Sequence, residues 1–68
     1  MKFKENLKAL RKQVNLTQPE LAEKLKIHFR TVQNYEMGTR EPNLDMLVEI
    51  ADFFDVSLDV LIGRNFPK

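Results

Sequence analysis

The stretch that decides the fold runs from residue 16 to residue 38 and reads LTQPELAEKLKIHFRTVQNYEMG. Near its start, Thr17 is followed three residues later by Glu20, which is the pattern of a helical capping box. Pro19 suits the first turn of a helix, because the N–H that it lacks would have no partner there. We therefore expect a short helix to begin after Thr17. Its inward face carries Leu21, Ala22 and Leu25.

A second short helix is expected directly after this one. The two are separated by the three-residue turn Lys26-Ile27-His28, and the second helix should run from Phe29 to Glu36 with His28 in the cap position. Gly38 suits a left-handed C-terminal cap. Two short helices joined by so short a turn form a helix-turn-helix, a unit whose second helix can project from the domain.

Three further helices complete an all-α chain. Phe3, Leu7 and Leu10 lie on one stripe of a helix at residues 3–13. Asn43 and Ser57 are suitable N-caps for the other two. These two are expected at residues 44–54, with Leu44, Leu47, Ile50, Ala51 and Phe54 in register, and at residues 58–62, which Gly63 ends. The prediction is one compact five-helix domain at residues 1–63, followed by a short tail at 64–68.

Composition excludes several classes of protein. The 68 residues suffice for one domain, and the absence of cysteine rules out disulfides and thiolate zinc sites. No apolar run approaches the roughly 20 residues of a membrane helix, and no secretory leader is visible, so we expect a cytoplasmic protein. We expect no metal, no cofactor and no small-molecule ligand.

Charge is distributed unevenly along the chain. Residues 1–42 contain nine Lys or Arg against five Glu, whereas residues 43–68 contain five acids against two bases. A basic part within a nearly neutral chain can present a cationic face to a polyanion. An ordinary mixed surface would have the same composition.

The exposed side of the second short helix has the chemistry of a major-groove reader. At about 100° per residue, Val32 and Tyr35 face the core and Thr31 lies at an edge. Arg can hold guanine with two hydrogen bonds, Asn or Gln can hold adenine in the same way, and Phe can pack on a thymine methyl group. The expected base-reading residues are Phe29, Arg30, Gln33 and Asn34. A merely solvated polar face remains the alternative.

Phosphate contacts are expected around that helix. Gln18 lies at the amino end of the preceding helix, where free N–H groups and the helix dipole favour anions. Arg40 lies in the loop after the reading helix, although it could instead pair with Glu41 or Glu36. The full expected set is Thr17, Gln18, His28, Thr31, Thr39 and Arg40.

The chain resembles the helix-turn-helix family of phage repressors and Cro proteins. The residues that carry the resemblance are 16–25, 32–38, 42–44 and 51–61, and it extends over about residues 3 to 63. It implies a five-helix bundle, dimeric binding to palindromic operators and control of transcription. It also implies that Gln18 positions DNA, that Phe29, Arg30 and Asn34 read bases, and that Arg11 and Glu36 form a structural ion pair.

Three positions depart from the family pattern. Phe29 stands where a small polar residue or glutamine is common, and His28 stands where Ser or Thr usually caps the helix. Lys26 replaces a frequent glycine in the turn, which strains the backbone if its φ is positive.

A monomer would read too few base pairs for selectivity, so we expect a twofold-symmetric homodimer on double-stranded DNA. The candidates for its interface, which could instead only complete the core, are Phe53, Leu58, Val60 and Ile62. The expected function is repression, because so small a domain can occlude a promoter by binding to it.

Two other classes of function fit the sequence less well. A protein-interaction module, such as an antitoxin or an adaptor, would use the acidic fourth helix or the apolar C-terminal end. An enzyme is not expected, because no phosphate loop, nucleophile elbow or metal constellation occurs. Asp45, Glu49 and Asp52 lie at helical spacing and are interpreted as a solvated face.

Overall fold

The computed structural model describes residues 2–64 and contains five α-helices, with no strand in that part of the chain. The helices are α1 (Phe3–Gln13), α2 (Gln18–Leu25), α3 (Phe29–Met37), α4 (Leu44–Phe54) and α5 (Leu58–Ile62). The predicted all-α five-helix architecture is confirmed. Apart from Arg64, the predicted tail lies outside the described residues.

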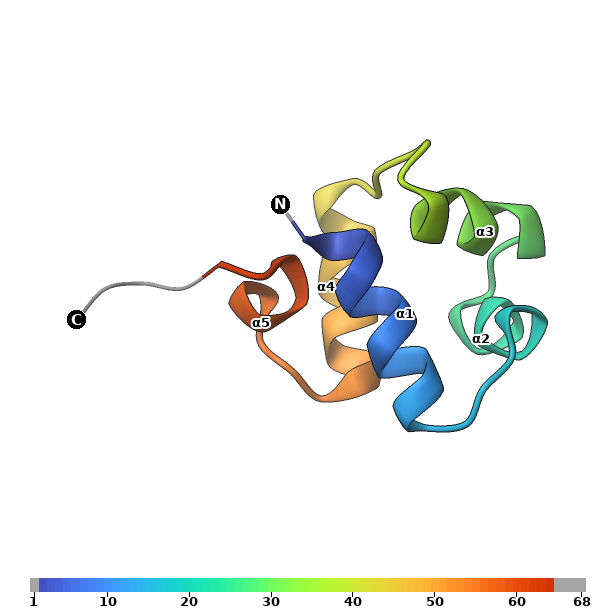
Figure 1. Cartoon of the computed structure of the whole chain (residues 1–68), viewed down its shortest axis with the longest axis horizontal. Helices are drawn as coiled ribbons and strands as arrows, with labels where there is room; N and C mark the ends of the chain where they lie inside the picture. The colour runs from blue at the N-terminus through green and yellow to red at the C-terminus, as the bar shows by residue number, and fades with distance from the viewer. Residues whose placement is uncertain (1, 65–68) are drawn as a thin grey trace.

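The helices pack around α1 (Figure 1). In this view α2 and α3 lie on one side of α1, α5 lies on the other, and α4 passes behind it. α1 contacts α3 and α5, while α4 contacts α5 and α2. The two short helices of the helix-turn-helix pack against each other and occupy one side of the domain.

Every helix contributes to one apolar core. The fully buried side chains are those of Leu7, Leu21, Val32, Ile50 and Leu61, one from each helix. At one edge, the ring of Phe3 meets the ring of Tyr35 edge to face, with centroids 5.8 Å apart. Because each helix supplies a completely buried residue, none of the five can leave without opening a void in the core.

Side chains cap the amino ends of four helices. At α2 the predicted capping box is present: Glu20 N donates to Thr17 Oγ1 over 3.2 Å, and Thr17 N donates to Glu20 Oε1 over 2.8 Å. The predicted caps at the other three are also confirmed: His28 Nδ1 accepts from Arg30 N, Asn43 Oδ1 from Met46 N, and Ser57 Oγ from Val60 N.

Left-handed residues end α2, α3, α4 and α5. The cap residues are Gly38 and Gly63, as predicted, together with Lys26 at φ 58° and Asp55 at φ 56°. The positive φ of Lys26 confirms that the turn needs a conformation that glycine adopts without strain. α3 ends at Met37, one residue later than predicted, because Gly38 is the first residue to leave the helix.

The predicted apolar stripe of α4 is wrong at its first residue. Leu44 is 65% exposed, whereas Ile50 and Ala51 are buried and Leu47 and Phe54 pack against the core. Leu44 has the correct helical angle, but it lies at the end of α4, where no other element covers it. Val48, one turn later, is 40% exposed.

The beginning of the chain holds α5 in place. Lys2 N donates to Ile62 O over 2.9 Å, and Asn6 Nδ2 lies within 3.2 Å of Val60 O and 3.1 Å of Leu61 O. Gly63 allows the close approach, since a Cβ there would lie 2.8 Å from Lys2 Cβ. α5 is too short to be stable alone, so its carbonyl groups depend on these donors.

We expect Ile50→Ala to lower the free energy of unfolding by about 2–5 kcal/mol, because it leaves a cavity in a fully buried site. Val48→Ala, a similar truncation on the same helix, should change it by about 0.5 kcal/mol or less because Val48 is exposed. Urea titrations followed by circular dichroism measure both. Should Ile50→Ala prevent folding, Ile50→Val should cost about 0.5–1.5 kcal/mol. Equal effects at the two positions would contradict the assigned core.

The capping box should make stability depend on pH. Hydrogen bonds from Thr17 lower the pKa of Glu20, so this carboxylate stabilises the fold above the ordinary glutamate pKa and loses that effect in acid. Glu20→Gln keeps a capping side chain that does not titrate. We expect the wild type to have the higher Tm at neutral pH, and the difference to shrink from about pH 5 to pH 3. A constant difference over that range would refute this role of Glu20.

Candidate nucleic-acid interface

The solvent-facing side of α3 carries the predicted reading residues. Arg30 is exposed, Phe29 is 38% exposed, and Gln33 and Asn34 are half-buried. On the opposite side Val32 and Tyr35 are buried in the core, as the helical period predicted. Burial also raises the pKa of the Tyr35 hydroxyl group. The four candidates therefore lie outside the core on a helix that the core anchors.

The polar groups of this face are not used inside the protein. The side chains of Arg30, Gln33 and Asn34 form no hydrogen bond or ion pair with residues 2–64. Phe29 is likewise absent from the core cluster, whereas Ile27, two residues earlier, packs against that cluster. The donors, acceptors and one aromatic ring of these four side chains are thus available to an external ligand.

His28 connects this face to the turn before it. Its Nδ1 accepts the N–H of Arg30 at 3.0 Å and so caps α3. In the neutral ring the hydrogen is then on Nε2, which leaves one donor on the exposed edge of the side chain. Thr31, predicted to lie at the edge of the face, is half-buried.

At the start of α2, Thr17 and Gln18 have different surroundings. Thr17 Oγ1 accepts from Glu20 N, so its own hydroxyl hydrogen can be donated outward. Gln18 is half-buried, and its Nε2 donates to Glu36 Oε1 over 3.0 Å. This link between α2 and the last turn of α3 was not predicted. The two residues are 18 positions apart, and no local pattern marks them as neighbours.

Arg11 and Glu36 form the ion pair that the resemblance implied. Arg11 Nε donates to Glu36 Oε2 at 2.7 Å and Nη2 to Oε1 at 3.0 Å, while Nη1 donates to Leu16 O at 2.8 Å. Their side chains are only 11% and 3% exposed. The hydrogen bond to Glu36 is the main cause of the raised pKa of Arg11. Removing one partner of such a pair costs about 3–5 kcal/mol, because the other charge is left buried.

The loop after α3 contains Thr39 and Arg40. Thr39 Oγ1 donates to Asn34 O at 3.3 Å, a carbonyl group at the end of α3 that also accepts from Thr39 N at 3.0 Å. Arg40 is exposed and forms no ion pair within residues 2–64, so the predicted alternative of a salt bridge with Glu41 or Glu36 is absent.

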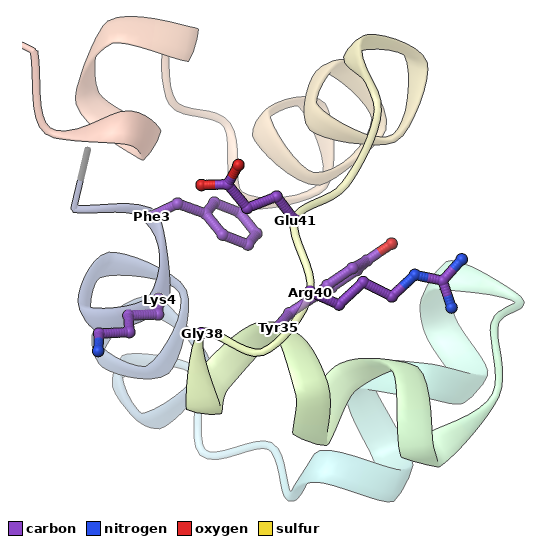
Figure 2. Close-up of a pocket in the computed structure, with 6 residues that line it drawn as sticks. All are labelled: Phe3, Lys4, Tyr35, Gly38, Arg40 and Glu41. Atoms are coloured by element: carbon purple, nitrogen blue, oxygen red, sulfur yellow. The ribbon is translucent and has the colours of Figure 1, made fainter.

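Arg40 also lines a small hollow together with Phe3, Lys4, Tyr35, Gly38 and Glu41 (Figure 2). Figure 2 shows the ammonium group of Lys4 and the guanidinium group of Arg40 pointing in opposite directions. The two cations therefore do not converge on one anion in this hollow.

The predicted dimer residues do not all lie in one hollow. Phe53 and Val60 are 38% and 56% exposed, whereas Leu58 and Ile62 are half-buried. Phe53 lines a hollow with residues of α2 and α4, and Val60 lines a different one with residues of α1.

The acidic side chains of α4 were predicted to form a solvated face. Asp45, Glu49 and Asp52 are all exposed. Among the described residues, no group of three or more His, Cys, Asp or Glu is placed to hold a metal ion. None of the helices in that part of the chain has the length and hydrophobicity of a bilayer span.

Residues 7–61 match the family model for helix-turn-helix proteins. The chain is also similar to YqaE of Bacillus subtilis, which is described as an HTH-type transcriptional regulator, with 48% identity over 67 residues. It is 41% identical over 64 residues to RstR, a transcriptional repressor of the cryptic phage CTXphi of Vibrio cholerae.

These matches span 97% and 94% of the chain, but only 58% of YqaE and 57% of RstR. The crystal structure of a transcriptional regulator from Listeria innocua superimposes with a TM-score of 0.87 and 35% identity, over 97% of this chain and 62% of that one. The chain therefore belongs to the helix-turn-helix family, in agreement with the resemblance to phage repressors seen in its sequence.

Proposed function

We propose that the chain binds double-stranded DNA as the reading domain of a transcription regulator and places α3 in the major groove. The observation that carries this proposal is the outer face of α3, where Arg30, Gln33 and Asn34 have no partner in residues 2–64. Any polar side chains would keep this face of α3 soluble, so solubility does not explain why these three residue types occur there. Forked and planar groups of this kind are those that pair with base edges.

Four residues divide the reading of the bases. Arg30 donates to guanine O6 and N7, while Gln33 and Asn34 form paired hydrogen bonds with adenine. Phe29, at the start of α3, packs against the methyl group of a thymine. Each good paired contact discriminates by about 1–3 kcal/mol against the wrong base.

Phosphate contacts flank the reading helix on both sides. Thr17, Gln18 and His28 have outward donors at the start of α2 and in the turn, and Arg40 has an unpaired guanidinium group after α3. Thr31 and Thr39 complete the set at the edges of the face. These contacts fix the register of the domain on the duplex and make its affinity depend on salt.

The selective form is a homodimer on a palindromic operator. Two copies read half-sites about 34 Å apart, one turn of the duplex, and so double the number of bases read. The residues proposed to meet in the dimer are Phe53 and Val60, which are exposed, and Leu58 and Ile62, which are half-buried. Binding represses transcription by occluding the promoter, in keeping with the description of RstR as a repressor.

One feature favours a second function, that of a protein-interaction module such as an antitoxin or adaptor. Leu44 and Val48 are exposed among the acidic residues of α4 and offer an apolar strip with a charged border. Partner binding that is insensitive to salt, without retention of DNA, would favour this alternative over the first.

Selection of bound duplexes from a random pool tests DNA reading. We expect a twofold-symmetric consensus whose affinity falls as salt rises. Arg30→Ala should relax the preference at one position in each half-site, at a cost of about 1–3 kcal/mol. Lys24→Ala removes the same charge from a hollow shared with Glu49 and Asp52, so it should leave the consensus unchanged. An unsymmetrical consensus would refute the dimer, and the absence of any consensus would refute sequence reading.

Phe29 allows a test at the level of a single methyl group. In the selected site, replacing the thymine opposite Phe29 by deoxyuridine should weaken binding by about two- to fivefold, because one methyl group is no longer buried. Phe29→Ala should make the protein indifferent to this replacement. Band-shift titrations with the two duplexes measure both effects. Equal affinities of the wild type for both duplexes at every thymine would exclude the methyl contact.

A further inference from the structure

We infer that Glu36 is a positioning residue for DNA, although it is buried and cannot touch a base or a phosphate itself. It holds the side chain of Gln18 in the orientation in which Gln18 meets a phosphate. This inference rests on the proposed binding of DNA. It adds a mechanism that links the phosphate contact of Gln18, on α2, to the base contacts of α3.

The carboxylate of Glu36 is fully engaged by three N–H groups. Oε2 accepts from Arg11 Nε, and Oε1 accepts both from Arg11 Nη2 and from Gln18 Nε2, each over 3.0 Å. The side chain of Glu36 is 3% exposed, so water does not compete for these positions. Arg11 fixes the carboxylate through two parallel bonds, and the remaining acceptor position of Oε1 is directed at Gln18.

This contact determines which way the amide of Gln18 faces. A carboxylate only accepts hydrogen bonds, so the NH₂ group, and not the carbonyl oxygen, must face Glu36. One N–H is used there, and the second has no partner within residues 2–64. The amide is thus ordered before a ligand arrives, which removes part of the entropic cost of using it.

Gln18 also provides the N–H groups that remain available at the amino end of α2. The capping box occupies the N–H groups of Thr17 and Glu20, and Pro19 has none. In the first turn of α2 this leaves the backbone N–H and the side-chain N–H of Gln18, neither of which has another partner in the described chain. A phosphate at this end of α2 therefore meets Gln18, whose side chain is held by a residue of the reading helix.

A double-mutant cycle tests this coupling. The variants are Gln18→Ala, Glu36→Gln and the double variant, each titrated against the operator duplex selected with the wild type. Gln18→Ala should weaken binding by about tenfold, the effect of one lost hydrogen bond to a charged group. Glu36→Gln should weaken it by a similar factor. The double variant should be within about twofold of Gln18→Ala, because Glu36 acts through Gln18.

Arg30→Ala provides the control for this cycle. Combined with Glu36→Gln, its effect should multiply, because Arg30 forms no contact with the Glu36 network. Effects of Gln18→Ala and Glu36→Gln that also multiply would overturn the inference while leaving DNA binding intact. A wild type that selects no duplex would overturn both proposals.

A measurement on the unaltered protein covers the case in which Glu36→Gln fails to fold. The side-chain amide of Gln18 should have a ¹⁵N order parameter near that of rigid backbone, about 0.85, whereas that of exposed Gln13 should lie below about 0.6. Equal, low values for Gln13 and Gln18 would overturn the inference without any variant.

Discussion

The structure depends on one buried negative charge. The carboxylate of Glu36 belongs to α3, its partner Arg11 to α1, and the guanidinium group of Arg11 also holds the carbonyl oxygen of Leu16 in the loop before α2. An isolated carboxylate in this position would be strongly disfavoured. The domain can bury it only when all three segments are in place, so the ion pair makes their arrangement mutually dependent. The outer face of α3 is presented at a defined angle for that reason.

The limits of the helices could be predicted because local chemistry sets them. Thr17, His28, Asn43 and Ser57 each bond a backbone N–H two or three residues ahead, and such a contact needs no information from the rest of the chain. The two faces of α3 followed from the helical period alone. Local caps and the helical period therefore account for the five-helix architecture and for the placement of the predicted reading residues on the outer side of α3.

What could not be predicted depends on which elements meet. Leu44 has the right angle on its helix and is exposed because no other element extends over that end of α4. The contact of Gln18 with Glu36 joins two helices through side chains alone. Asp55 adopts a positive φ although it is not a glycine, so the residue type does not predict this conformation. Packing between elements decides each of these outcomes, and local sequence patterns do not predict that packing.

The bonds from Lys2 and Asn6 to the carbonyl groups of α5 affect how the protein is made. The bonds of Asn6 join positions 54 and 55 residues apart, and the bond from Lys2 to Ile62 joins the two ends of the helical domain. A growing polypeptide can form α1 and the helix-turn-helix early, but α5, which completes the core, is missing until residue 62 has left the ribosome. Completion of the domain is therefore a late and concerted event of synthesis, and the apolar side of α1 must wait exposed until then.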